Sequence, residues 1–159
     1  MRRMLGNRVT PKFESGMLIA KATEWAEQQS ALILCDGMPL NTNNTNLARS
    51  VGVVHPERIR ILHVAQIPLP GNPQPIKMAT ETGLLTPNIA GLTLGYGIYL
   101  RHLQCTTRLL SHECRHVYQY EQAGSIAAFL AEYLKQIAQY GYVNAPLEID
   151  ARRHEVVAN

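Results

Sequence analysis

Two histidines and a glutamate at helical spacing are the residues of this chain best suited to do chemistry. His112, Glu113 and His116 form the pattern H-E-x-x-H. Positions i and i+4 are neighbours on one face of an α-helix, so both imidazoles can bind a single cation. Glu113 can hold a metal-bound water and accept its proton. Two histidine ligands and a carboxylate base form the core of a zinc metallopeptidase site.

A catalytic zinc site needs a third protein ligand, and three residues are candidates. Position 122 is Gln122, so the extended motif of metzincins, which has a third histidine there, is absent. Glu121 follows the motif at a spacing that points it off the ligand face. Glu148 comes after one connecting helix, near the start of a further helix, which is the gluzincin arrangement. We therefore favour Glu148 as the third ligand, ahead of Asp150 and then His154.

Three successive helices are expected to position these residues. Thr106 or Thr107 can cap a helix that carries the motif and ends near Gln122. Its site face is shared by Leu109, Val117 and Tyr120, whereas Cys114 points away and is expected to pack in the core.

The second helix begins at Gly124-Ser125 and ends at Gly141, with an apolar face at helical spacing. That face comprises Ile126, Leu130, Tyr133, Leu134 and Ile137. The third helix begins with Asn144 as its cap and Pro146 in its first turn, and continues to Arg153.

The stretch from Gly91 to Arg101 has the alternation of a single β-strand. One face carries Leu92, Leu94, Tyr96, Ile98 and Leu100, and the other carries Gly91, Thr93, Gly95, Gly97 and Tyr99. Glycines in a strand often mark the close approach of another backbone. A peptide substrate that adds to the sheet as an extra strand would be such a backbone. We expect Gly95, Tyr96 and Gly97 to bind substrate; a tightly packed strand or a bulge is the alternative.

The first fifty residues predict a long helix, a loop and a short helix. The long helix runs from about Phe13 to Leu34 and ends at Asp36-Gly37. Its expected buried residues are Met17, Leu18, Trp25 and Leu32. The polar segment Pro39–Thr45 is typical of a loop. A short helix is expected at Asn46–Arg49.

The middle of the chain predicts one extended segment followed by a rigid loop. The segment Ile59–Ile67 is expected to be partly covered on both faces, with His63 packed in the core and not a ligand. Four prolines in Pro68–Pro75 predict a loop and not a strand. A short helix over Lys77–Leu85 and a turn at Thr86–Asn88 complete this part.

Composition fits one domain of 159 residues with a net charge of +3. We divide it into an N-terminal helix and loop (1–45), a small sheet region (46–105) and the metal-site helices (106–159). The scattered basic residues argue against nucleic acid as a partner. The three cysteines suggest no disulfide framework. The longest apolar stretch, Asn88 to Leu100, is too short for a bilayer and no signal sequence is evident, so a cytoplasmic protein without membrane contact is expected.

The segment from Leu109 to Glu121, with its H-E-x-x-H-V-x-Q-Y-E pattern, resembles small bacterial gluzincin-like proteins similar to the DUF4157 family. The resemblance covers about residues 45 to 155. It implies an α+β, mostly helical minimal zincin core with a small sheet whose edge strand lines the cleft. It also implies that His112, His116 and Glu148 bind Zn²⁺ while Glu113 is the base. Larger gluzincins often carry a carboxylate one turn after the ligand glutamate, but this chain has Arg152 there.

These observations predict zinc-dependent hydrolysis of peptide bonds. The alternative is a catalytically inactive zinc-binding module for interaction or secretion. A helical binding domain with an accidental motif is a further alternative, and the lack of paired cysteines argues against a DNA-associated protease with a zinc ribbon. Candidate oxyanion donors are Tyr118, Tyr120, Tyr140, Tyr142 and His154. Because the chain is short, we expect a small or flexible peptide substrate, or a partner that completes the cleft.

Overall fold

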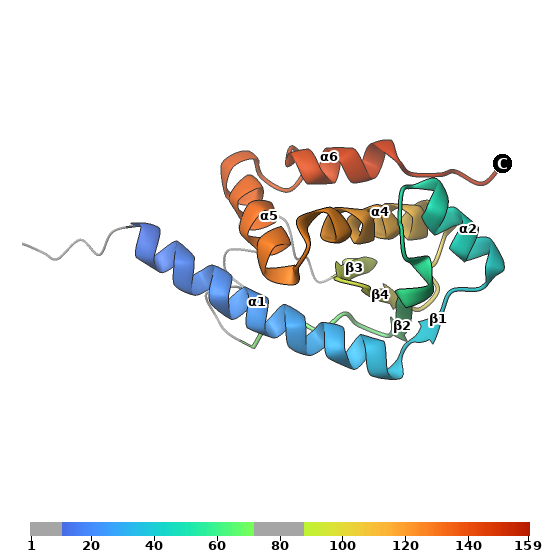
Figure 1. The fold of residues 1–159 in the computed structure, drawn as a ribbon, viewed down its shortest axis with the longest axis horizontal. Helices are drawn as coiled ribbons and strands as arrows, with labels where there is room; N and C mark the ends of the chain where they lie inside the picture. The colour runs from blue at the N-terminus through green and yellow to red at the C-terminus, as the bar shows by residue number, and fades with distance from the viewer. Residues whose placement is uncertain (1–10, 72–87) are drawn as a thin grey trace, which may run out of the picture.

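The computed structural model describes residues 11–71 and 88–159, and these form an α+β fold (Figure 1). The described helices and strands are α1 (Pro11–Asp36), β1 (Met38–Pro39), α2 (Thr42–Ser50), the 3₁₀ turn η1 (Pro56–Arg58), β2 (Arg60–Val64), β3 (Gly91–Leu94), β4 (Gly97–Arg101), α4 (Thr107–Ala123), α5 (Ile126–Tyr140) and α6 (Pro146–Arg153). The predicted fold class is therefore confirmed. The helix expected at Lys77–Leu85 and most of the turn before Asn88 lie outside the described residues.

A small mixed sheet lies between α1 and α4 (Figure 1). Its strand order is β1-β2-β4-β3, so β1 and β3 are the two edges. β2 and β4 pair in parallel, whereas β1 pairs antiparallel with β2 and β3 pairs antiparallel with β4. The helix α6 packs against the far side of α4, and α5 packs against both α1 and α4. The sheet and α6 therefore flank the helix that carries the H-E-x-x-H motif.

The glycine-rich stretch is a hairpin and not the single strand that its alternation predicts. β3 ends at Leu94, which pairs with Gly97 at the start of β4. The connection is the two-residue turn Gly95-Tyr96, in which Gly95 has a φ of +67°. Glycine adopts this conformation readily, and two-residue hairpin turns require positive φ. The alternation suits two paired strands as well as one, so it does not reveal the turn.

The three helices after β4 begin and end close to where the sequence predicts. Thr106 caps α4 by accepting a hydrogen bond from the amide of Leu109 at 3.1 Å. Ser125 caps α5 in the same way, and Gly141 follows the last residue of that helix. For α6 the expected cap is wrong: Ala145 occupies the cap position and makes no side-chain hydrogen bond, although Pro146 is in the first turn as expected.

The N-terminal helix forms as predicted but buries a different face. Met17 and Leu32 are 50% and 49% exposed, so two of the expected core positions are wrong. The buried side chains are those of Ala26, Ser30 and Ile33, and Trp25 is partly buried beside them. The close approach of α1 to the sheet is permitted by Gly97 of β4, since a Cβ there would lie 2.9 Å from Ile33.

Three further predictions in the first half of the chain need correction. The segment expected as a loop becomes helix α2 from Thr42 onward, because Asn41 accepts a hydrogen bond from the amide of Asn44 at 2.8 Å and caps the helix. His63, expected in the core, is exposed near the end of β2, with its ring 6.3 Å from that of His102. The strand expected at Ile59–Ile67 is shorter in the structure, since β2 covers only Arg60–Val64.

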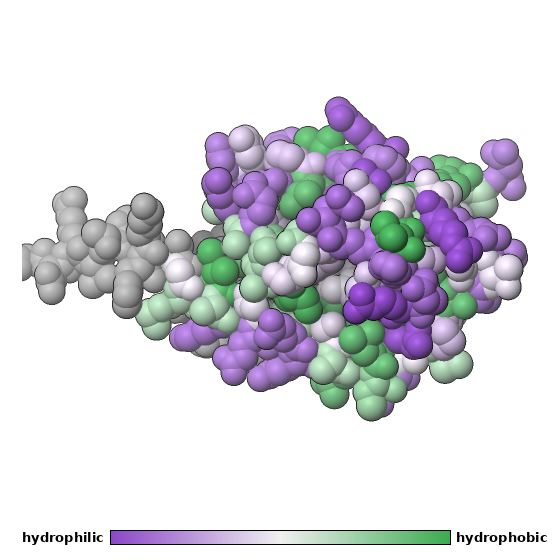
Figure 2. All heavy atoms as spheres, viewed as in Figure 1, coloured by the Kyte–Doolittle hydropathy of each residue, from purple (hydrophilic) through white to green (hydrophobic). Residues whose placement is uncertain are grey.

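The core has two parts, one on each side of the sheet. The first lies between α1, α5 and the hairpin, and the second is enclosed by α2, β2, β4 and α4. Cys114 is fully buried in the second part, as expected for a packing residue. Figure 2 shows that hydrophilic residues cover much of the visible face, with smaller hydrophobic groups between them. Among the described helices, none combines the length and apolarity needed to cross a membrane.

Candidate metal centre

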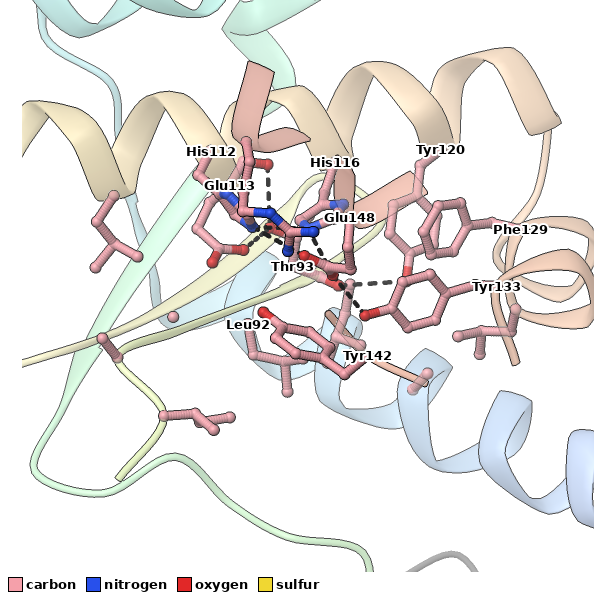
Figure 3. A pocket seen from close by; sticks show the side chains of 18 of the residues that line it. Leu92, Thr93, His112, Glu113, His116, Tyr120, Phe129, Tyr133, Tyr142 and Glu148 are labelled. Atoms are coloured by element: carbon pink, nitrogen blue, oxygen red, sulfur yellow. Dashed lines mark hydrogen bonds and ion pairs between the residues drawn. The ribbon is translucent and has the colours of Figure 1, made fainter. Parts of the chain in front are cut away.

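Helices α4 and α6 bring His112, His116 and Glu148 together at one end of a cavity (Figure 3). The Nε2 atoms of the two histidines are 3.2 Å apart. Glu148 Oε2 lies 3.3 Å from Nε2 of His112, and Glu148 Oε1 lies 3.2 Å from Nε2 of His116. All three side chains are buried, and this group of ligand atoms can hold one metal ion. Glu148, which the sequence favours as the third ligand, is thus the carboxylate that lies beside both histidines.

The carboxylate of Glu148 has the properties of a metal ligand. The residue is 1% exposed, and its Oε2 is buried without a hydrogen-bond partner among the described residues. Burial opposes ionisation, but the imidazoles of His112 and His116 hold the pKa of Glu148 below its usual range. A buried carboxylate oxygen without a partner is costly. A divalent cation would supply that partner, and two imidazole nitrogens with one carboxylate are a donor set that zinc accepts.

Both histidines are oriented with Nε2 toward the ligand cluster. His112 Nδ1 lies 3.0 Å from Glu155 Oε1, and a carboxylate can only accept, so Nδ1 carries the proton. The other carboxylate oxygen of Glu155 accepts from Arg108 Nε at 2.5 Å. Hydrogen bonding at one ring nitrogen fixes the tautomer and leaves the other free to bind metal. Glu155 thus supplies the supporting carboxylate that is missing one turn beyond Glu148, where the chain has Arg152.

The second histidine is oriented by an amide. His116 Nδ1 lies 2.8 Å from Gln119 Oε1. The amide nitrogen of Gln119 donates to the carbonyl oxygen of Leu147 at 2.9 Å and to Asp150 Oδ2 at 2.8 Å. These two acceptors fix the amide orientation, so Oε1 must accept from His116. Asp150, the alternative ligand, is therefore a support for the cluster and not a member of it.

Contact with Glu148 also affects the protonation of the ligands. Burial favours the neutral imidazole, but the hydrogen bond and negative charge of Glu148 raise the pKa of His116 to about 9. The pKa of His112 is raised by the same carboxylate against the effect of burial. A histidine must lose this proton to bind a metal, so metal binding at this cluster releases protons.

Glu113 lies in the same cavity and is held by strand β3 (Figure 3). Its side chain is 5% exposed, and its Oε2 accepts a hydrogen bond of 2.6 Å from the hydroxyl of Thr93. A Cβ on Gly91 would lie 2.6 Å from Glu113 Oε1, which is closer than real Cβ contacts allow. The carboxylate therefore has Oε2 bound by Thr93 and Oε1 next to the bare backbone of Gly91.

The edge strand lines the metal-site cavity, but not with the residues we expected to bind substrate. Gly91 to Leu94 line it, whereas Gly95 and Tyr96 line a different cavity. The Tyr96 hydroxyl donates to Glu121 at 2.9 Å, and Gly97 packs against Ile33, which a Cβ would approach to 2.9 Å. The space beside the glycines near the hairpin turn is thus occupied by side chains of the same chain.

Three tyrosines reach the cavity, two of them from the expected set of oxyanion donors. Tyr142 lines it, as does Tyr120, whose hydroxyl donates to the carbonyl oxygen of Thr93 at 3.2 Å. Tyr133, which the helical pattern assigned only to the core, donates to Glu148 Oε1 at 2.7 Å. The others lie elsewhere: Tyr118 packs on Arg115, Tyr140 is 47% exposed, and His154 contacts the carbonyl oxygen of Asp150.

No protein-family model, curated protein or solved structure matches the chain. The geometry of the site therefore carries the functional interpretation by itself. That geometry places a buried triad able to hold a metal beside a second carboxylate that faces the same cavity.

Proposed function

We propose that this protein is a zinc-dependent peptide hydrolase. The observation that carries the proposal is the buried Glu148 oxygen that no described residue hydrogen-bonds, next to two Nε2 atoms and in the same cavity as Glu113. His112, His116 and Glu148 would hold the ion. Three protein ligands leave a coordination position free, which is typical of catalytic zinc sites and not of structural ones.

Bound zinc lowers the pKa of a coordinated water to about 7 and polarises the substrate carbonyl. The protein's own part begins at Glu113, which accepts a proton from the attacking water at Oε1, the oxygen not bound by Thr93. The hydroxyl oxygen bonds to the carbonyl carbon, the carbon–nitrogen bond breaks, and Glu113 returns the proton to the leaving amine.

Tyr142 is the side chain we assign to the oxyanion. It lines the cavity, and burial together with the charge of Glu148 raises the pKa of its hydroxyl, so the hydroxyl stays protonated and able to donate. Tyr120 and Tyr133 are less suited because both are buried and their hydroxyls donate to Thr93 and Glu148, whereas Tyr142 is partly exposed. A donor aimed at developing negative charge stabilises the transition state.

A comparison of wild-type and Glu113→Gln protein, both loaded with zinc, tests the proposal on a mixed peptide library analysed by mass spectrometry. Glutamine keeps the shape but cannot accept the proton, so we expect cleavage to fall at least about a hundredfold while the zinc content stays the same. Equal cleavage by both proteins would rule out Glu113 as the base. Absence of cleavage by zinc-loaded wild-type protein would favour an inert zinc-binding module instead.

A further inference from the structure

The cavity at the metal centre has an apolar extension. The whole cavity has a volume of about 560 Å³, and the extension continues from the triad into the space between α1, β3 and α5. The side chains that line this extension include Ala22, Trp25, Ala26, Leu92, Phe129 and Leu134. Ligand pockets commonly measure about 300–1,000 Å³ and combine a mostly apolar lining with a few polar groups. The extension and the triad together fit that description.

The apolar lining begins directly at the reactive groups (Figure 3). Tyr133 donates to Glu148 at 2.7 Å, and its ring stacks on that of Phe129 with centroids 5.2 Å apart. Leu92 and Thr93 both line the cavity, and the hydroxyl of Thr93 binds Glu113. A peptide bond held at Glu113 therefore has the apolar extension within reach of the adjoining residue.

Charged groups are confined to the other end of the cavity. Among the described lining residues, every Arg or Glu comes from α4, α6 or the segment after α6, and none from α1 or α5. They are engaged within the protein: Arg108 pairs with Glu155, and Arg152 donates to the carbonyl oxygen of Val143. A charged substrate group in the extension would lose its water without gaining a partner, which is costly.

We propose that the extension binds a large apolar side chain, aromatic or leucine-like, of a residue that flanks the hydrolysed bond. This inference rests on the proposed peptide hydrolysis and adds the substrate class. Its basis is the apolar lining, the absence of charge from α1 and α5 along the described wall, and the stacking of Phe129 in that lining on Tyr133, the partner of Glu148. Burial of apolar surface supplies the binding free energy.

Trp25 allows binding to be measured separately from catalysis. It is the single tryptophan of the chain and lines the extension. Zinc-loaded Glu113→Gln protein is titrated with blocked alanine tetrapeptides in which one position is varied to Phe, Leu, Ala or Asp, and Trp25 fluorescence is followed. We expect the Phe and Leu peptides to bind about tenfold or more tightly than the Ala and Asp peptides, because a large side chain leaves water.

Two substitutions in the same helix provide the control. Ala22→Phe fills the extension and is expected to weaken binding of the Phe peptide at least about tenfold. Ala20→Phe, at an exposed position of α1, is expected to leave it unchanged. Equal affinity for Phe and Asp peptides, or no effect of Ala22→Phe, would overturn the inference. Tight binding of Phe peptides without any hydrolysis by wild-type protein would contradict the proposed activity but support the proposed binding site.

Discussion

At the scale of residues, the two histidines of the triad are supported by different chemistry. Glu155 gives His112 a negatively charged partner that is itself paired with Arg108, whereas Gln119 gives His116 a neutral one. A carboxylate behind an imidazole increases its basicity and fixes its orientation. We therefore expect the Glu155 contact to contribute more to metal affinity than its place at the edge of the site suggests.

Replacement of Glu155 by glutamine tests this support. We expect zinc affinity to fall about 10- to 100-fold, the range typical for loss of such a partner, as measured by competition with a chelator of known affinity. Glu132→Gln, on the exposed face of α5, removes the same charge away from the site and serves as the control. Equal zinc affinity in both variants would show that Glu155 does not support His112.

Thr93 is expected to position the base. Thr93→Val keeps the shape of the side chain but removes the hydroxyl that donates to Glu113 at 2.6 Å. A hydrogen bond to a charged group contributes about 1.5–3 kcal/mol, so we expect kcat for a cleaved peptide to fall about tenfold or more, with little change in KM or zinc content. Thr93→Ser restores the hydroxyl and should restore most of kcat. If serine does not restore it, packing and not the hydrogen bond explains the loss.

At the scale of elements, the site depends on how α6 docks on α4. Arg115 of α4 donates to Asp150 of α6 at 2.8 Å and 3.2 Å and to the carbonyl oxygen of Val51 at 2.7 Å. The same carboxylate accepts from Gln119, so this contact both joins the helices and fixes the orientation of the His116 partner. The docking and the geometry of the ligands are thus coupled.

Loss of Arg115 should weaken this junction. Arg115→Met leaves Asp150 and the Val51 carbonyl without their partner, and we expect the free energy of unfolding to fall by about 1–3 kcal/mol in urea titrations with chelator present. Arg153→Met, at an exposed position of α6, is the matched control. An unchanged urea midpoint in the Arg115 variant would show that the junction does not stabilise the fold.

The sequence revealed the elements that have local signals. Caps at Thr106 and Ser125 and the helical period located α4 and α5, and the spacing of His112 and His116 predicted that their side chains meet. The turn at Gly95 was missed because alternation does not record a positive φ. Because the turn was missed, Gly95, Tyr96 and Gly97 were expected on a single strand along the substrate cleft.

Long-range contacts were the other source of error. The support by Glu155 was missed because a helical search expects the partner one turn after Glu148. The chain instead leaves helix α6 after Arg153 and reaches His112 beyond it. Met17 and Leu32 were likewise expected in the core, but their exposure depends on which side of α1 meets the sheet.

At the scale of the whole molecule, the triad joins two helices that are separated in sequence by α5. A ligand that binds only the folded state stabilises it, by about 4 kcal/mol at a thousand times its dissociation constant. We expect zinc to raise the thermal midpoint of wild-type protein and a chelator to reverse this. Glu148→Gln, which keeps the shape but removes the ligand charge, should abolish the shift. A shift of the same size in that variant would place the metal elsewhere.

The most direct test of the account is the zinc content of purified protein, measured by mass spectrometry of metals alongside protein concentration. We predict about one tightly bound zinc ion per wild-type chain and a large loss on Glu148→Ala, with Glu132→Ala unchanged. Wild-type protein that binds no zinc from solution, or a Glu148→Ala protein that retains it with unchanged affinity, would contradict the assignment of His112, His116 and Glu148 as one metal centre.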